Sequence, residues 1–268
     1  RDLDATEAED TDIEQRFVFA GLAAMADLPR PGVREALRSV IAAGMRVIML
    51  TGDDPVTAVA VARRIGMPQG PVLTGEELAA LDDTRLDALL TAPAVVFSRV
   101  SPRDKHRIVL ALKRIGDVVA VTGDGVNDTL SLKQADIGVA MGRLGSDVAK
   151  EAAEIVLVDD NFSTLVAAIG EGRTIFQNLR RVILSSITSN LGELSVVCLG
   201  FAGVALGLPI PITAVQILAI DLIGEMLPLM ALTFDPADAG VMRQPPRRLD
   251  AHIVNRRSLV ELLADGAL

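Results

Sequence analysis

The sequence predicts an α/β domain with a parallel sheet, followed by two helices that cross a membrane. Short apolar runs alternate with segments of helical periodicity over the first 160 or so residues, which is typical of a parallel sheet covered by helices. Two long apolar stretches follow, at residues 182–208 and 212–234, and each is long enough to span a bilayer. Half of the 268 residues are hydrophobic, in keeping with both parts.

The composition argues against a nucleic-acid partner. The chain has 35 acidic and 26 basic residues, a net charge of −9, and neither tryptophan nor tyrosine. A polyanion would be repelled by such a chain, so no nucleic-acid partner is expected beyond a nucleotide phosphate. Cys198 is the single cysteine, which rules out an internal disulfide and favours a reducing compartment for the soluble part.

The chain divides into five segments in order. Residues 1–16 are an acidic lead-in, and residues 17–161 are expected to form the α/β domain. Its strands are predicted from apolar runs at 17–24, 47–50, 94–97, 118–121, 137–140 and 155–158. Its helices are predicted at 33–43, 56–65, 75–81 and 104–115. The remaining segments are a stalk helix at 162–181, a helical hairpin at 182–234 and an incomplete cytoplasmic segment at 235–268.

The segment 118–128 joins an apolar run to a glycine-rich turn that carries two carboxylates. Gly123 and Gly125 permit a sharp backbone turn, so that Asp124 and Asp128 can converge on one ion. Mg²⁺ favours a few carboxylates together with phosphate oxygens and water. An ordinary Asp-Gly and Asn-Asp surface turn would have the same local sequence. Two further segments favour the magnesium site.

The first is the strand 47–50, which ends in Thr51-Gly52-Asp53. Carboxyl ends of parallel strands meet at one edge of a sheet, and the Thr51 hydroxyl can donate a hydrogen bond to a phosphoryl oxygen there. The alternative is structural, because Asp53 or Asp54 could simply cap the helix that begins near Pro55.

The second is the helix that opens at Ser101-Pro102, with Lys105 in its first turn. A cation is unfavourable at the amino end of a helix dipole. An anion opposite Lys105 would remove this penalty, and a fixed ammonium would neutralise charge on a transferring phosphoryl group. An exposed surface lysine is the alternative.

These segments together resemble the phosphorylation domain of P-type cation-transporting ATPases, in the haloacid-dehalogenase superfamily. The resemblance rests on Thr51-Gly52-Asp53, Lys105 and the run from Thr122 to Asp128, in this order, and it extends from about residue 17 to 246. It implies a Rossmannoid fold, Mg²⁺ as cofactor and ATP as substrate of the complete pump. By the same resemblance Asp124 and Asp128 bind the metal. The catalytic group would comprise Thr51, Gly52, Asp53, Lys105 and Asn127.

The resemblance also implies that parts of a pump are absent from these residues. The family's phosphorylated aspartate lies in an Asp-Lys-Thr-Gly-Thr motif that this sequence does not contain. The nucleotide-binding domain, the actuator domain and the earlier membrane helices are missing as well, so a C-terminal fragment that is inactive alone is expected. Residues 129–132 read Thr-Leu-Ser-Leu where the family usually has Ala-Pro-Ala-Leu, and the lost proline could alter a hinge.

The hairpin is expected to have both ends in the cytoplasm. Arginines precede it at positions 173, 180 and 181 and follow it at 243, 247 and 248, while its short connection is uncharged. The positive-inside rule then places both ends of the hairpin, and with them the phosphorylation domain, in the cytoplasm. A multi-pass protein of the cell membrane is expected. A buried hairpin of a soluble protein is the alternative.

Polar residues inside the hairpin predict a cation site. Asn190 and Glu193 are three residues apart and Asp221 and Glu225 four apart, so each pair shares one helix face. Carboxylates at membrane depth are costly, and an oxygen-lined cage suits a hard cation or a proton. The four positions resemble ion-binding positions of the calcium and sodium/potassium pumps. Gly224 and Glu225 depart from that pattern, which leaves Ca²⁺, Na⁺, K⁺ and H⁺ open.

The leading hypothesis is part of an ATP-driven cation pump in which phosphoryl transfer to an aspartate drives transport. A membrane-tethered, magnesium-binding regulatory or phosphatase-like module without transport is one alternative. A gene remnant is another.

Overall fold

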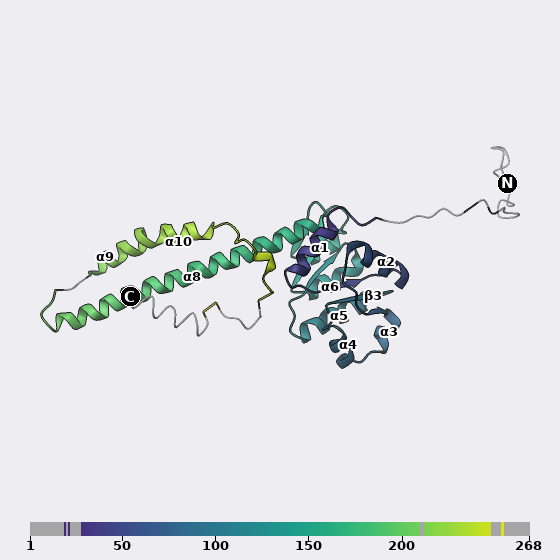
Figure 1. Cartoon of the computed structure of the whole chain (residues 1–268), viewed down its shortest axis with the longest axis horizontal. Helices are drawn as coiled ribbons and strands as arrows, with labels where there is room; N and C mark the ends of the chain where they lie inside the picture. Colours follow the sequence, from purple (N-terminus) through teal and green to yellow (C-terminus); the bar gives the residue numbers. More distant parts are fainter. Residues whose placement is uncertain (1–18, 20, 22–27, 210–211, 248–252, 255–268) are drawn as a thin grey trace, which may run out of the picture.

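The computed structural model describes residues 19, 21, 28–209, 212–247 and 253–254. It consists of an α/β domain from which a long helical hairpin extends (Figure 1). The acidic lead-in at 1–16 lies outside the described residues, as does the strand predicted at 17–24 except for two isolated positions. Most of the segment beyond residue 247 also lies outside them. The predicted α/β class with a helical hairpin is confirmed.

The strands form two three-stranded sheets, and every pairing is parallel. The first has the order β1-β3-β2, with β1 at Val47–Leu50, β2 at Val72–Thr74 and β3 at Ala94–Ser98. The second has the order β4-β5-β6, with β4 at Ala120–Gly123, β5 at Ile137–Met141 and β6 at Ile155–Leu157. The predicted parallel pairing is confirmed, and among the described residues the strands are divided between two sheets, because β1 and β4 each form an edge and do not pair with each other.

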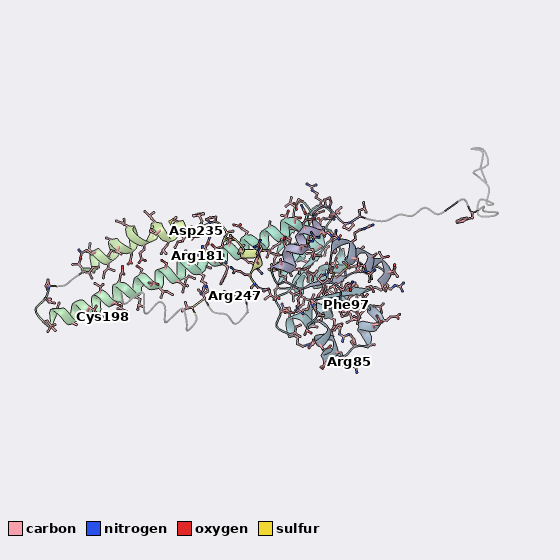
Figure 2. The ribbon with its side chains drawn as sticks, viewed as in Figure 1. Arg85, Phe97, Arg181, Cys198, Asp235 and Arg247 are labelled. Atoms are coloured by element: carbon pink, nitrogen blue, oxygen red, sulfur yellow. The ribbon has the colours of Figure 1, made fainter. Side chains whose placement is uncertain are left out.

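The first sheet is covered on both faces, because side chains along β3 alternate between them. Val95 and Phe97 pack with α3, α4 and α5, whereas Ala94 and Val96 pack with α1 and α2. The covering helices are α1 (Val33–Ala42), α2 (Pro55–Ile65), α3 (Gly75–Ala80), α4 (Asp83–Leu89) and α5 (Pro102–Arg114). The fully buried ring of Phe97 marks the centre of the domain (Figure 2).

The second sheet is also covered on two sides. Ala140 of β5 packs with α6 (Thr129–Gln134) and α7 (Asp147–Ala152), while its neighbour Val139 contacts Leu165 at the base of α8. The run predicted as a buried strand at 118–121 differs, because β4 begins two residues later and Val118 is 57% exposed. Val118 therefore lies in the irregular segment that leads into the strand and not in the strand itself.

Helix α8 runs unbroken from Phe162 to Val204, 43 residues in all. The Asn161 side chain caps its start by accepting a hydrogen bond of 2.9 Å from the Ser163 N–H. At 1.5 Å per residue it is about 64 Å long, roughly twice the thickness of a bilayer core. Glycines 170, 172 and 192 lie within this helix and do not interrupt it.

The chain returns alongside α8 through α9 (Ala214–Ala219), a π-helical segment (Ile220–Glu225) and α10 (Met226–Thr233) (Figure 1). Both arms of this hairpin are long and apolar enough to cross a membrane. Pro228 has no N–H for the carbonyl one turn earlier, so a change of helical register just before it is expected.

The segment after α10 folds back onto the stalk. Arg181 pairs with Asp238 at 2.6 Å and Asp235 at 3.6 Å, and Figure 2 shows Arg181 and Asp235 side by side. Arg247 lies 3.9 Å from the centre of the Phe176 ring.

Arg173 ties the stalk to two other segments. Its guanidinium donates hydrogen bonds to the carbonyls of Val241 (3.0 Å), Gln244 (2.7 Å) and Ala43 (2.9 Å). Ala43 is the residue that ends α1. The hairpin is therefore fixed to the α/β domain at both of its ends.

Candidate functional site

Lys105 and Asp128 form a direct ion pair. The Lys105 Nζ lies 2.7 Å from the Asp128 Oδ1, and both side chains are mostly buried. Lys105 stands on α5, whose start is fixed by a capping box between Ser101 and Asp104. Asp128 ends a 3₁₀ turn, Val126–Asp128, that follows β4. The anion that the sequence placed opposite Lys105 is thus, in this structure, the carboxylate of Asp128.

The turn that carries Asp124 is tightly built. A Cβ on Gly123 would lie 2.5 Å from the Asp128 Cβ, so this close approach requires glycine. The Gly125 N–H donates to the Asp128 Oδ2 at 3.4 Å, and the Ser146 N–H donates to the Asp124 carbonyl at 2.8 Å. The backbone of Asp124 is therefore anchored, while its side chain is exposed at the carboxyl end of β4.

Thr51, Gly52 and Asp53 form a neighbouring turn at the end of β1. The Asp53 N–H donates to the Thr51 Oγ1 at 3.1 Å, and a hydroxyl that accepts one bond still has its own hydrogen to donate. The backbone just after β3 holds this turn, with hydrogen bonds from Val100 N to Thr51 O (3.1 Å) and from Arg99 N to Asp53 O (2.9 Å). Among the described residues no hydrogen bond joins this turn to Lys105 or Asp128.

Asp54 is the residue that caps α2. It accepts from Val56 N at 2.8 Å and Thr57 N at 3.2 Å, so the structural alternative applies to Asp54 and leaves Asp53 exposed. The Thr57 hydroxyl, followed by these two N–H groups, lowers the pKa of Asp54 below its ordinary value. Asp54 is therefore ionised at neutral pH and stabilises the start of α2.

Sequence reasoning missed Arg99. It directly follows β3 and adopts a left-handed backbone conformation, with φ of 50°. A Cβ on Gly75 would lie 2.5 Å from the Arg99 carbonyl oxygen, so the two segments pass very close together. The positive charge stands beside Asp54, whose pKa it also lowers. Arg99 directly follows the apolar run of β3, in the sequence Arg-Val-Ser-Pro. This position predicts a place at the carboxyl end of the strand, where the other site residues lie.

The donor set at the end of β4 fits Mg²⁺. Asp124 offers an exposed carboxylate, and Asp128 has two oxygens of which Lys105 contacts one. Hard oxygen ligands in small number, with the remaining positions left to water and phosphate, are what this ion prefers. Asn127 is exposed in the same turn and offers a further oxygen.

A second group of carboxylates lies in the hairpin. Glu193 of α8 and Asp221 and Glu225 of the π-helical segment each have an oxygen within 4.8 Å of the others. We call these three residues the acidic cluster. One buried oxygen of Glu193 and one of Glu225 have no hydrogen-bond partner among the described residues. Orphaned carboxylate oxygens in an apolar hairpin fit a hard cation.

Asn190 stands three residues before Glu193 on α8. Its side chain is exposed and donates to the Ser186 carbonyl one turn earlier, at 2.7 Å. The structure brings together the three carboxylates predicted for the cation site, those of Glu193, Asp221 and Glu225.

Two family profiles match the chain. The haloacid dehalogenase-like hydrolase profile matches residues 1–136, and the profile described as cation transporting ATPase, C-terminus, matches residues 209–268. Among solved structures, the catalytic domain of the CPx-ATPase CopB-B is 30% identical, with a TM-score of 0.42 over 54% of this chain and 46% of that chain.

Curated relatives match most of the chain. Calcium-transporting ATPase 1 of Yarrowia lipolytica is 46% identical over 235 residues, which cover 86% of this chain and 25% of the relative. Calcium-transporting ATPase type 2C member 1 of Homo sapiens is 40% identical over 255 residues, 94% of this chain and 27% of the relative. The chain thus spans about a quarter of the length of these relatives. The chain belongs to the haloacid dehalogenase-like hydrolases and, within them, to the P-type cation-transporting ATPases.

Proposed function

We propose that this chain provides magnesium-binding and phosphoryl-binding residues, together with part of the cation path, of a pump that uses ATP to transport Ca²⁺. The single observation that carries the proposal is α8. It begins against the second sheet of the α/β domain and continues without a break to Glu193 of the acidic cluster. The names of the relatives, which are calcium-transporting ATPases, favour Ca²⁺ among hard cations.

Each residue of the candidate site has a role in this proposal. Asp124 and Asp128, with Asn127 beside them, hold Mg²⁺, which supplies charge neutralisation to the transferring phosphoryl group. The Lys105 ammonium faces the same group, and the Thr51 hydroxyl donates to one of its oxygens, with Gly52 and Asp53 shaping that turn. Since Lys105 now contacts Asp128, its ammonium is already held at the metal-binding turn.

We propose that a strand from outside this chain carries the phosphorylated aspartate. The sequence contains no Asp-Lys-Thr-Gly-Thr run. The edges of β1 and β4 suit such a strand, because each is parallel and unpaired on one side among the described residues. Arg46, just before β1, is bonded to Asp117, three residues before β4, so the amino ends of the two strands lie close together.

The acidic cluster is the proposed Ca²⁺ site, and the hairpin crosses a membrane with both ends in the cytoplasm. We place the α/β domain in the cytoplasm and the pump, as a multi-pass protein, in the cell membrane. The arginines at both ends of the hairpin support this orientation.

Labelling of native membranes tests the transport proposal. Source membranes are incubated with radiolabelled ATP and Ca²⁺, and an acid gel is probed with an antibody against residues 104–115. We expect an acid-stable phosphoprotein about four times the mass of this 28.3 kDa chain, because the chain spans about a quarter of its relatives. Antibody-reactive bands without label, at any size, would contradict the proposal.

The metal assignment is tested on the chain itself in detergent. Titration calorimetry with Mg²⁺ should give a dissociation constant that rises at least about tenfold, or ~1.4 kcal/mol, in Asp124→Asn. Asp147→Asn is the matched control, because Asp147 is 96% exposed and, within the described part of the chain, pairs with Lys150 alone, on its own helix. Equal affinities for wild type and Asp124→Asn would refute the assignment.

A further inference from the structure

Asp160 is an unusual residue at the base of α8. It lies two positions before the first residue of the helix and has a left-handed backbone conformation, with φ of 55°. This conformation is uncommon outside glycine, and aspartate is among the few other residues that adopt it readily. Asp160 is also buried, with 7% of its surface exposed, and its carbonyl accepts a hydrogen bond from the Arg30 guanidinium.

The Asp160 carboxylate holds the loop that follows β5. Its two oxygens accept hydrogen bonds from the N–H groups of Arg143 (2.9 Å) and Leu144 (3.0 Å). The Arg143 N–H lowers the pKa of Asp160, burial opposes this, and the Leu144 N–H adds to the lowering, so that the net direction is downward. An ionised carboxylate with two backbone donors is a strong anchor.

The other end of the same loop holds the candidate metal ligand. We call residues 142–146 the β5 loop. Its last residue, Ser146, donates its N–H to the Asp124 carbonyl at 2.8 Å. Its first residue, Gly142, donates to the Leu157 carbonyl at 2.9 Å. The β5 loop is therefore fixed to the base of α8 on one side and to the turn after β4 on the other.

The β5 loop has little room to deform between these two anchors. A Cβ on Gly145 would lie 1.9 Å from the Met141 carbonyl oxygen, and one on Gly142 would lie 2.8 Å from that of Leu157. The backbone folds back on itself at contact distance. A displacement at Arg143 and Leu144 must then move Ser146, because a close-packed loop cannot absorb it.

We propose that Asp160 is a positioning residue that sets the place of Asp124 through the β5 loop and so couples the metal site to the start of α8. The inference rests on the proposed role of Asp124 in binding Mg²⁺. In this proposal the backbone of the β5 loop connects the start of α8 to the metal site. Asp160 itself contacts neither the ion nor the phosphoryl group.

The first test replaces Asp160 with asparagine in the full chain. The asparagine side chain has one acceptor oxygen, and its NH₂ group would face one of the two N–H donors, Arg143 or Leu144. One of the two hydrogen bonds that hold the β5 loop is therefore lost. We expect the dissociation constant for Mg²⁺, measured by calorimetry, to rise about tenfold, as is usual when a supporting residue of a metal site is removed. An unchanged constant in a variant with wild-type circular dichroism would overturn the inference.

Asp159→Asn is the matched control. Asp159 is the adjacent carboxylate, but it bonds to the Thr164 hydroxyl (2.6 Å) and the Asn161 N–H (3.1 Å), both at the start of α8 itself. The variant disturbs the same helix end and removes a charge near the Arg143 guanidinium, but it leaves both hydrogen bonds from the β5 loop to Asp160 in place. Its Mg²⁺ affinity should therefore stay within about twofold of wild type. An equal loss in both variants would mean a general effect of the helix end and would overturn the specific role of Asp160.

The second test needs no variant. Coupling is reciprocal, so Mg²⁺ bound at Asp124 must strengthen the anchor at the other end of the β5 loop. Hydrogen exchange of the Arg143 and Leu144 amides in the wild-type chain should slow severalfold on addition of Mg²⁺. If bound Mg²⁺ does not change the exchange rate of these two amides, the inference is overturned. This test remains decisive even if Asp160→Asn fails to fold.

The failure of this inference can be told from failure of the proposed function. If Asp124→Asn abolishes Mg²⁺ binding and Asp160→Asn does not weaken it, the metal assignment stands and the coupling does not. If Asp124→Asn leaves binding unchanged, the metal assignment itself is wrong and the coupling falls with it.

Discussion

The Lys105 Nζ lies 2.7 Å from the Asp128 Oδ1, and the two side chains retain only 17% and 13% of their exposure. The pair joins α5, which belongs to the first sheet, to the turn that follows β4 of the second. Each of these two mostly buried charges stabilises the other. If one were removed, the other would remain as a partly buried ion without a partner.

Lys105→Met should therefore lower the free energy of unfolding by about 2 kcal/mol, since it leaves the Asp128 carboxylate unpaired. Denaturation of the chain followed by circular dichroism measures this change. Lys105→Met combined with Asp128→Asn should recover most of the loss. Lys150→Met, at a pair whose Asp147 is 96% exposed, should cost no more than about 0.5 kcal/mol. Similar losses for the two lysine variants would show that burial of the Lys105 pair has no energetic weight.

Gly123→Ala should disturb the candidate metal site through steric contact. The new methyl would lie 2.5 Å from the Asp128 Cβ and 2.9 Å from its Cγ, so Asp128 or the turn must shift. We expect a destabilisation of about 1–3 kcal/mol in thermal denaturation, together with weaker Mg²⁺ binding. Gly52→Ala is the control for stability, because nothing lies within 4 Å of its Cβ position. Unchanged thermal stability of Gly123→Ala would contradict the packing described for this turn.

Asp136 should contribute to the loss of stability in acid. Burial raises its pKa, but the Val119 N–H at 2.9 Å and the Lys113 ammonium outweigh this, so the net shift is downward. A lowered pKa in the folded state means that the contribution is complete above the unfolded pKa of about 3.9 and is lost as the pH falls through the folded value.

Asp136→Asn should accordingly be less stable than wild type at pH 7 and lose less stability between about pH 4 and pH 2. Thermal midpoints measured from pH 7 downward test this expectation. Asp147→Asn controls for the loss of one negative charge. Parallel curves for Asp136→Asn and wild type would show that Asp136 has no share in the acid transition.

Arg173→Ala should release the segment that follows the hairpin. The side chain bonds to three carbonyls, those of Ala43, Val241 and Gln244, and its loss leaves them without this donor. Tryptic cleavage after Arg243 should become about tenfold faster, which corresponds to ~1.4 kcal/mol of local opening. Arg180→Ala, at an exposed arginine two turns further along α8, should leave the rate unchanged. A rate in Arg173→Ala equal to wild type would rule out this anchoring role.

Much of the fold was accessible from the sequence because helices cover its strands on both faces. Such strands give uninterrupted apolar runs, and those at β1, β3 and β5 were placed within a residue. Strand β2 was missed because it has three residues and one of them, Val72, is 40% exposed. Helices α6 and α7 have six residues each, too few for a 3.6-residue period to show.

The apolar runs in the sequence could not predict that the strands are divided between two sheets. A local apolar pattern shows that a segment is a strand but not which strand it pairs with, and the pairing of β1 with β3 rather than β4 depends on the whole domain. Helix α4 could have been found, because Asp82 accepts from the Arg85 N–H as an ordinary N-cap would.

The candidate sites were predicted residue by residue, but not their contacts. The spacing of Asp221 and Glu225 placed them on one helix face, whereas their approach to Glu193 depends on how α8 and α10 pack. The same spacing argument included Asn190, and the hydrogen bond from its amide to the Ser186 carbonyl of its own helix was not predicted. Asp160 gave no signal of its own, because a left-handed aspartate cannot be recognised from its neighbours in sequence.

The length of α8 makes it a lever arm. Glu193 lies 31 residues beyond Phe162, which places its backbone about 47 Å along the axis from the first residue of the helix. If α8 tilts as a rigid rod by about 5° at its base, that point moves sideways by about 4 Å. Calcium–oxygen contacts span only about 2.3–2.6 Å. A rotation too small to unpack the α/β domain would thus be large enough to open the acidic cluster.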